Sequence, residues 1–377
     1  MTAIGELDEQ QPNGTAGSAP APTPAAINNR NADESPQSVM NVIRVMDERV
    51  RRGDLAGFEP VATGFAELDQ ALGGGFTPGQ LILLSGPAGV GKTSLMLQIA
   101  RNMALGNRAA CLFVCYEHET DYLAQRLVSM ESIAVGDGTP SDGLRMRDIA
   151  ELVARYSGKR QGMSAAGPGF TEAISYDPRG VRALQRISRY SQNLHLMKGS
   201  SARTTVEALS NSVQQIRAPG GAAAGKPVVL FVDYLQKVAS TTPHTSEEAR
   251  NFEEVEGLKE LALDQRIVVV AIAAADVEGL KAQRLRLQHM LTSAGIAYEA
   301  DLIILMNEKY DIVDHRHIEY NRHNAEAYHQ YVVLSIEKNR AGADMVDLEL
   351  RKQLQFCHFR TDARRVQEHL VTGRPRE

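Results

Sequence analysis

The stretch from Leu81 to Leu95, LILLSGPAGVGKTSL, constrains the fold of this 377-residue chain more than any other. An apolar run leads into a G-x-x-x-x-G-K-T motif, which is the strand, loop and helix order of a phosphate-binding P-loop. Glycines let successive backbone N–H groups turn toward a phosphate, and the positive end of the following helix points at the same anion. The motif therefore predicts a nucleoside triphosphate site between a buried strand and a helix.

The predicted nucleotide-binding residues form the loop and the first turn of the helix: Gly86, Pro87, Ala88, Gly89, Val90, Gly91, Lys92, Thr93 and Ser94. Lys92 is expected to reach the β- and γ-phosphates of ATP. Thr93 is expected to place its hydroxyl on Mg²⁺, a hard cation that accepts few protein oxygens and keeps most of its waters. ATP and Mg²⁺ are therefore the predicted cofactors.

Composition favours a globular chain, because 43% of the residues are hydrophobic. A net charge of −5 does not indicate a general nucleic-acid binder, although it leaves room for a local basic channel. The three cysteines have neither metal-ligand nor disulfide spacing, which is typical of a reducing cytosol. No apolar stretch approaches the roughly 18 residues that span a bilayer, and no signal-peptide pattern opens the chain. We therefore expect a cytoplasmic protein without membrane association.

Four segments are expected along the chain. Residues 1–34 are rich in Ala, Pro, Gly and Asn and predict a disordered tail. Residues 35–53 carry apolar side chains at helical spacing, which predicts one amphipathic helix that packs on its own domain or on a neighbouring subunit. The P-loop domain is expected over 54–362, with a Gly-, Ser-, Asp- and Arg-rich insertion at about 133–178. Residues 363–377 are expected to form a C-terminal tail.

Buried strands are expected to alternate with helices around the P-loop, at residues 110–116, 227–232, 267–273, 301–306 and 331–336. Strand and helix in alternation predict an α/β fold with a parallel sheet and right-handed crossovers. The second of these strands is followed by Asp233. In P-loop enzymes such an aspartate holds the water shell of the magnesium ion, so Asp233 is the predicted metal carboxylate.

Two clusters of charged or titratable residues leave alternatives open. Arg179, Arg182, Arg186 and Arg189 fall on one helical face, which is either solvated or a phosphate-contacting stripe. Histidines at 315, 317, 323 and 329 match no zinc spacing, so a solvated hairpin is expected there.

Six motifs occur in a fixed order between about Val39 and Phe359: TGFAELDQALGGG, GPAGVGKT, a strand ending at Glu117, VDYLQ, MLTSAGIAYEADLIILMNEKYD and EKNRAG. This order resembles the ATPase domain of DnaB-type replicative helicases, and in part RadA-like and KaiC-like members of the RecA group. The resemblance implies a RecA-like fold with a mainly parallel sheet flanked by helices. It also implies an ATP-driven hexameric ring that acts on single-stranded DNA in replication or repair, moving 5′ to 3′ if it follows the family.

The resemblance also implies roles for individual residues. Glu117 corresponds to the base that polarises the attacking water, and Asp233 corresponds to the magnesium carboxylate. Lys338 and Arg340 correspond to a pair that reaches the nucleotide of the neighbouring subunit as an arginine finger. The helix at 35–53 corresponds to a linker helix that packs on the adjacent subunit, and loader or replication proteins are implied partners.

Three departures from the family pattern bear on DNA work. The family's replicative members carry an N-terminal helical domain where this chain has the predicted tail, and a polar Ser-Gln pair is replaced by Ala273-Ala274. The DNA-contacting loop, Arg-Glu-Ser-Gly in the family, reads Leu291-Thr292-Ser293-Ala294 here. The basic residues Lys281, Arg284 and Arg286 are either substitute phosphate contacts or an ordinary basic face. The alternative function is therefore an ATP-binding assembly ATPase that does not separate strands.

Overall fold

The computed structural model describes residues 35–371 except 54, 56–57, 135–141, 157–166, 219, 222, 224, 243, 245, 291–293 and 315–321, and the chain divides into two compact units, Met1–Asp54 and Leu55–Glu377. In the first unit, helix α2 (Val39–Arg51) begins after Ser38, whose hydroxyl caps the helix by accepting from the Asn41 N–H. No residue of α2 is buried, so its apolar stripe is exposed within this unit. The predicted tail at residues 1–34 lies outside the described residues.

The second unit is built on one twisted sheet whose described strands run in the order β10-β8-β7-β6-β1-β5-β4-β2-β3. Six neighbouring strands are parallel: β3 (Leu194–Lys198), β2 (Ala110–Cys115), β4 (Val228–Asp233), β5 (Val268–Ile272), β1 (Leu81–Ser85) and β6 (Leu302–Glu308). The other four strands run antiparallel to their partners: β7 (Tyr331–Asn339), β8 (Val346–Gln353), β9 (His358–Phe359) and β10 (Arg364–Arg365). The sheet is thus mainly parallel, as the sequence predicts.

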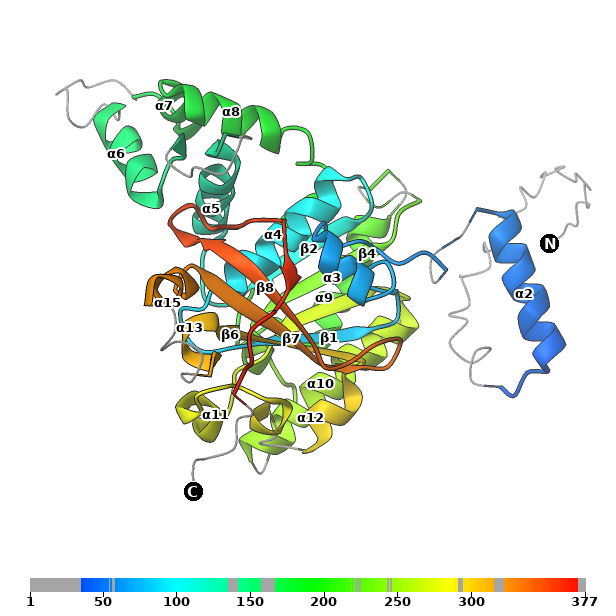
Figure 1. Ribbon diagram of the computed structural model, residues 1–377. Coiled ribbons are helices and arrows are strands. Elements are labelled where there is room, and N and C mark those ends of the chain that lie inside the picture. Colours follow the sequence, from blue (N-terminus) through cyan, green and yellow to red (C-terminus); the bar gives the residue numbers. More distant parts are fainter. Residues whose placement is uncertain are drawn as a thin grey trace, which may run out of the picture. The chain divides into compact units, whose positions relative to one another are not determined.

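Helices cover both faces of the sheet (Figure 1), because successive strand residues point to opposite sides. One core joins Ile82 and Leu84 to α4 (Lys92–Leu105) and α5 (Thr120–Ser132). The other joins Leu81 and Leu83 to α9 (Val206–Arg217) and α10 (Glu247–Asp264). The P-loop strand β1 is buried along its whole length between these two cores.

The remaining helical elements lie in the connections: α3 (Ala66–Ala71), α6 (Met146–Tyr156), α7 (Phe170–Ser175), α8 (Pro178–Ile187), η3 (Leu235–Lys237), α11 (Val277–Lys281), η4 (Leu287–Met290), α12 (Ala294–Glu299), α13 (Lys309–Ile312), α15 (Arg322–Tyr328) and η5 (Leu354–Phe356). None of the helices in the described ranges is long and apolar enough to cross a membrane.

The segment predicted as an insertion contributes to a small helical layer beside the sheet, in which α6, α7 and α8 gather around the end of α5 (Figure 1). Val128 of α5, Ile149 of α6, Ile174 of α7 and Ala183 of α8 share one buried cluster with Leu144. The layer therefore has a core of its own and uses helices on both sides of the predicted insertion.

The chain after β8 packs back onto the sheet as far as Val371. Strands β9 and β10 both pair with β8, and the Val371 N–H donates to the carbonyl of Ile312 at 2.8 Å. The ammonium of Lys309, only 1% exposed, is enclosed by the carboxylates of Glu349 and Glu368. Residues 363–371 thus belong to the second unit, and the tail boundary expected at residue 363 lies too early.

Candidate functional site

The P-loop has the backbone geometry that its glycines allow. Gly91 has φ 101° and Gly89 has φ 81°, in the left-handed region that other residues rarely adopt. A Cβ on Gly86 would lie 2.8 Å from the Met306 carbonyl oxygen, and one on Gly91 would lie 2.8 Å from the Phe359 ring. Residues 86–91 therefore fold tightly between β1 and the start of α4, with strands β6 and β9 packed against the loop.

Lys92 lies inside the curve of the loop. Its ammonium donates to the carbonyl oxygens of Gly86 and Pro87 at 2.7 and 2.9 Å. Burial lowers the pKa of Lys92, and the carboxylates of Asp233 and Glu117 oppose that shift. The nearby negative charges thus favour the cation that a phosphate would need.

Thr93 and Asp233 meet at the end of the loop. The Thr93 hydroxyl donates to Asp233 Oδ2 at 2.8 Å, and Asp233 is 2% exposed. Burial raises the pKa of Asp233, whereas the hydrogen bond from Thr93 lowers it. A hydroxyl and a carboxylate side by side supply the hard oxygen ligands that Mg²⁺ accepts, so these residues fit the predicted ion. Among the described residues no group of three or more His, Cys, Asp or Glu side chains forms a dedicated metal site.

Glu117 follows the strand next to β4. Because Cys115 lies opposite Asp233 in the parallel register, Glu117 is two residues beyond that level at the same sheet edge. Glu117 is exposed at this edge. Glu119, also exposed, is paired with Lys198 at 3.2 Å, which ties it to the end of β3.

The residues after β5 complete this edge. The Ala273 N–H donates to the Leu84 carbonyl of β1, so Ala273 and Ala274 lie beside the start of the P-loop. Neither alanine carries a polar side chain. Instead, Gln236 from the segment after β4 reaches across, and its Oε1 accepts from the Ala274 N–H at 3.2 Å. In the sequence, Gln236 was noted only as part of the VDYLQ motif. The one indication that it could reach this position is that residues 273 and 274 are alanines, which carry no polar side chain of their own.

Lys338 and Arg340 lie at the opposite edge of the sheet. Strand β7 is antiparallel to β6, and Lys338 is opposite Ile303 at the beginning of β6. Lys338 donates to the Ala297 carbonyl at 2.6 Å, and Arg340 contacts the Tyr298 carbonyl and the carboxylate of Asp301. The five residues of β1, at about 3.3 Å each, put roughly 15 Å of strand between this edge and the P-loop. Within one chain, the structure does not bring Lys338 and Arg340 together with the predicted P-loop and magnesium residues.

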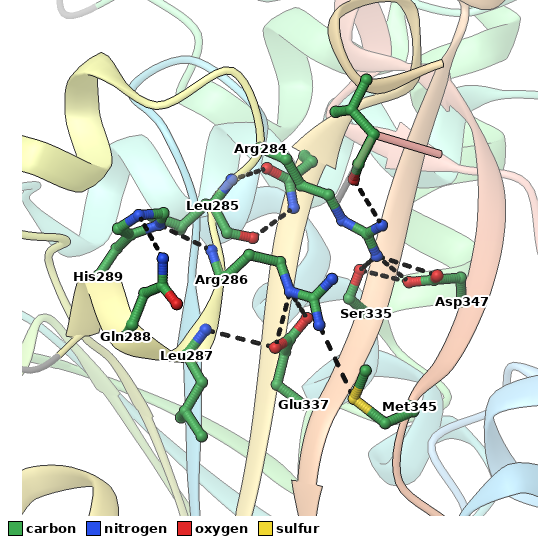
Figure 2. Close-up of polar contacts among 12 residues, drawn as sticks. Arg284, Leu285, Arg286, Leu287, Gln288, His289, Ser335, Glu337, Met345 and Asp347 are labelled. Carbon is green, nitrogen blue, oxygen red and sulfur yellow. Dashed lines mark hydrogen bonds and ion pairs between the residues drawn. The ribbon is translucent and has the colours of Figure 1, made fainter. Parts of the chain in front are cut away.

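Arg284 and Arg286 are not free basic groups (Figure 2). Arg284 is 5% exposed and donates to both carboxylate oxygens of Asp347 at 2.8 and 2.9 Å, and to the Ser335 hydroxyl. Arg286 is paired with Glu337 at 2.8 Å. Both guanidinium groups face strands β7 and β8, so the hypothesis that these two arginines contact phosphate is wrong. Lys281 is exposed and has no partner among the described residues, whereas Leu291, Thr292 and Ser293 lie outside them.

The arginines of α8 also have internal partners. Arg186 donates to the carbonyls of Glu131 and Ile133 at the end of α5, at 2.9 and 2.6 Å. Arg182 donates to the Ser132 carbonyl and is paired with Asp142 at 3.0 Å. These bonds satisfy carbonyls that a helix end leaves open. The arginines of α8 thus bind α8 to the end of α5 within the helical layer, a role that neither the solvated face nor the phosphate-contacting stripe included. Of the four arginines, only Arg189 is exposed, as a solvated face requires.

The histidine-rich stretch is only partly described, because His315 and His317 lie outside the described residues. The residues from Arg322 to Tyr328 form helix α15, so the expected hairpin is not seen in this part. His329 stacks on Tyr310 with ring centroids 3.7 Å apart.

The family model described as the DnaB-like helicase C terminal domain matches residues 60–162 and 174–361. The chain is 21% identical over 285 residues to the replicative DNA helicase DnaB of Haemophilus influenzae, covering 73% of this chain and 53% of that protein. It is 39% identical over 85 residues to the DNA repair protein RadA of the same organism, covering 22% of this chain and 17% of RadA. The chain therefore spans about half the length, or less, of these curated relatives.

The fold is similar to that of a solved DnaB-like replicative helicase, whose structure was described together with its interactions with primase. The two superpose with a TM-score of 0.60 and 19% sequence identity, covering 86% of this chain and 67% of the helicase chain. This agreement confirms the predicted α/β fold with a mainly parallel central sheet. Because the family model matches well over half of the residues, the chain belongs to the DnaB-like helicase C-terminal domain family.

Proposed function

We propose that this protein is an ATP-hydrolysing DNA helicase or translocase that works as a ring on single-stranded DNA in replication or repair. One observation carries the proposal: the residues predicted for catalysis are divided between two edges of one sheet. Thr93 and Asp233 adjoin at one edge, whereas Arg340 lies at the other. Because Arg340 is too far from its own P-loop, hydrolysis requires the P-loop edge of one subunit to face the Arg340 edge of the next.

At the P-loop edge, Lys92 and the loop N–H groups bind the phosphates of ATP. Thr93 and Asp233 would hold Mg²⁺, which would neutralise phosphate charge. Glu117 orients the attacking water and accepts its proton. From the neighbouring subunit, Lys338 and Arg340 stabilise the charge that spreads over the transferring phosphoryl oxygens. An arginine finger of this kind is worth on the order of 10³-fold or more in rate.

Repetition of this head-to-tail contact with rotation closes a ring, for which the family's hexamer is the proposed form. The exposed apolar stripe of α2, with Val39 74% and Met40 64% exposed, supports the proposal that residues 35–53 pack on an adjacent subunit. Single-stranded DNA would pass through the ring with sequence-tolerant backbone contacts. The proposal also includes movement from 5′ to 3′, a loader or other replication proteins as partners, and a cytoplasmic location.

The second candidate function is an assembly ATPase that uses nucleotide to set its oligomeric state without separating strands. Two observations favour it: Ala273 and Ala274 offer no polar side chain, and Arg284 and Arg286 are engaged within the chain. The two candidates agree on ATP hydrolysis and differ in their response to DNA.

The deciding experiment measures ATP hydrolysis by a size-selected oligomer, with and without single-stranded DNA, in Mg²⁺ and in excess chelator. A forked duplex with a single 5′ or 3′ tail then reports strand separation and its direction. The helicase proposal expects hydrolysis that depends on Mg²⁺ and is stimulated by DNA, together with unwinding from a 5′ tail. A rate of hydrolysis that does not change when DNA is added, together with no unwinding from either tail, would support the assembly ATPase instead.

A further inference from the structure

Gln236 lies where two strand ends meet the P-loop. It is the third residue after Asp233, within the 3-10 turn η3 that follows β4. Its side chain crosses to the end of β5, where its Oε1 accepts from the Ala274 N–H at 3.2 Å. The preceding residue, Ala273, donates its N–H to the carbonyl of Leu84 in β1. Leu84 lies two residues before Gly86, the first glycine of the P-loop. The amide of Gln236 is therefore at the carboxyl edge of the strands, in the position where ligands bind in open α/β sheets.

This hydrogen bond fixes the direction of the amide. The Ala274 N–H can only donate, so the oxygen of Gln236 must face it and the NH₂ group must point elsewhere. Among the described residues, no acceptor is bonded to this NH₂ group. Gln236 thus presents an uncharged donor at the catalytic edge, whereas its acceptor is already used.

The turn that carries Gln236 is held firmly. Leu235 and Val238 are buried, with 0% and 2% exposure, and Arg250 of α10 donates to the Gln236 carbonyl at 2.9 Å. These contacts hold the backbone of the turn, and the bond from the Ala274 N–H holds the amide oxygen. A donor on a support of this kind needs little reorganisation when negative charge develops next to it, which is the condition under which such donors act most strongly in catalysis.

We propose that Gln236 is a catalytic residue that donates a hydrogen bond to the γ-phosphate and so replaces the side chain missing at Ala273-Ala274. This inference rests on the proposed ATP hydrolysis and deepens it. In the reaction, the water oxygen bonds to the γ-phosphorus while its proton passes to Glu117. The bond from the γ-phosphorus to the bridging oxygen breaks, and its electron pair stays on ADP. Gln236 stabilises the charge on the transferring oxygens and makes no contact with ADP alone.

Two substitutions separate this role from a structural one. Gln236→Glu has nearly the same shape and keeps the oxygen that accepts from Ala274, but at about pH 8 it is ionised and cannot donate. Gln236→Ala loses both the acceptor and the donor. We expect kcat for ATP to fall roughly 10²-fold in both variants, the usual cost of removing one such donor. Gln185→Ala, on the exposed face of α8, is the matched control and should leave kcat unchanged.

Nucleotide affinity supplies a readout that does not depend on turnover. The ratio of the affinities for a non-hydrolysable ATP analogue and for ADP should fall in Gln236→Glu, while the ADP affinity stays at the wild-type value. If Gln236→Glu keeps the wild-type kcat and affinity ratio, Gln236 only braces the Ala274 N–H and the proposal is overturned. If the wild type fails to hydrolyse ATP, the proposed function fails, and the affinity ratio still decides the role of Gln236.

Discussion

The side chains of Thr93 and Asp233 are joined by a 2.8 Å hydrogen bond, although 140 residues separate them in the sequence. Thr93 is the second residue of α4, the helix that follows β1, and Asp233 ends β4, with β5 between these two strands in the sheet. The bond therefore links the P-loop to the second carboxylate across an intervening strand. It also defines the point at which the predicted magnesium ion would be held.

Replacement of Lys92 by Ala should abolish ATP turnover. The loop backbone provides N–H dipoles, but Lys92 is the side-chain cation of the loop that we propose binds the β- and γ-phosphates. Steady-state hydrolysis and binding of a fluorescent ATP analogue would test this, with Lys281→Ala as an exposed-lysine control for turnover without DNA. Wild-type turnover in Lys92→Ala would refute the P-loop assignment.

Glu117→Gln should separate binding from chemistry. The substitution keeps the shape of the side chain but removes the base, so ATP binding should persist while hydrolysis falls by roughly 10²-fold or more. Glu119→Gln is the matched control, because Glu119 already pairs with Lys198. If the Glu119 variant loses activity and the Glu117 variant does not, the two roles must be exchanged.

Mixing two inactive variants should test whether Arg340 acts between subunits. Arg340→Ala and Glu117→Gln should each bind ATP and hydrolyse it slowly. A mixed oligomer contains interfaces that combine an intact Glu117 with an intact Arg340, so part of the activity should return. Labelled subunits must first show exchange by energy transfer. Continued inactivity after exchange would mean that Arg340 serves its own chain, as its bond to Asp301 suggests for a structural residue.

Glu254 predicts a pH-dependent stability. Glu254 is 3% exposed, and neither of its carboxylate oxygens has a hydrogen-bond partner in the described part of the chain. Burial raises its pKa from 4.5 to about 7, although the positive charge of Arg250 lowers it. Because the folded state holds the proton more tightly, the stabilisation is fully present below about pH 4.5 and is lost as the pH rises through 7.

At about 1.4 kcal/mol for each pKa unit, the loss amounts to about 3 kcal/mol. Glu254→Gln should therefore gain about that much over the wild type between acid and mildly alkaline pH in urea unfolding. Glu256→Gln, on the exposed side of α10, should follow the wild-type pH profile. A pH-independent difference between Glu254→Gln and the wild type would show that Glu254 titrates normally.

Arg284 and Lys281 should give opposite phenotypes. Arg284→Ala removes the partner of Asp347 and should lower the free energy of unfolding by about 2 kcal/mol or more, less than for a fully buried pair because Asp347 is partly exposed. Lys281→Ala should leave stability unchanged. If Lys281 contacts DNA phosphate, the salt dependence of DNA binding should weaken by about one counterion. Normal stability of Arg284→Ala would contradict the structural role.

The sequence predicted the parts whose pattern is local. The P-loop, the buried strands that end at Cys115 and Asp233, and the mainly parallel sheet follow from motif and periodicity. Strand β3 was missed because Leu194–Lys198 is short, mixes apolar residues with His and Lys, and is only partly buried. The contacts that Arg186, Arg284 and Gln236 make with Ile133, Asp347 and Ala274 were missed, because these partners are 38 to 63 residues away and carry no spacing signal.

The boundary at residue 363 was placed too early for a similar reason. Strand β10 has only two residues, both exposed, and owes its place to β8. Composition makes such a segment resemble a tail, because its pairing is visible only in three dimensions. For Arg340, the order of the strands and the family resemblance predicted a position remote from the P-loop of its own chain, but the antiparallel direction of β7 was not part of that prediction.

The enclosure of Lys309 has a consequence for synthesis on the ribosome. The strands β1 to β5 are complete in the sequence before Lys309 is translated, and they pair among themselves. Lys309 then enters an almost fully buried position, but its partners Glu349 and Glu368 come from the last part of the chain. A buried cation without its carboxylates is costly, so we expect the packing around Lys309 to be completed only after the segment that carries Glu368 has been made. The side of the sheet that contains β6, next to β1, should therefore be the last part of the sheet to reach its final packing.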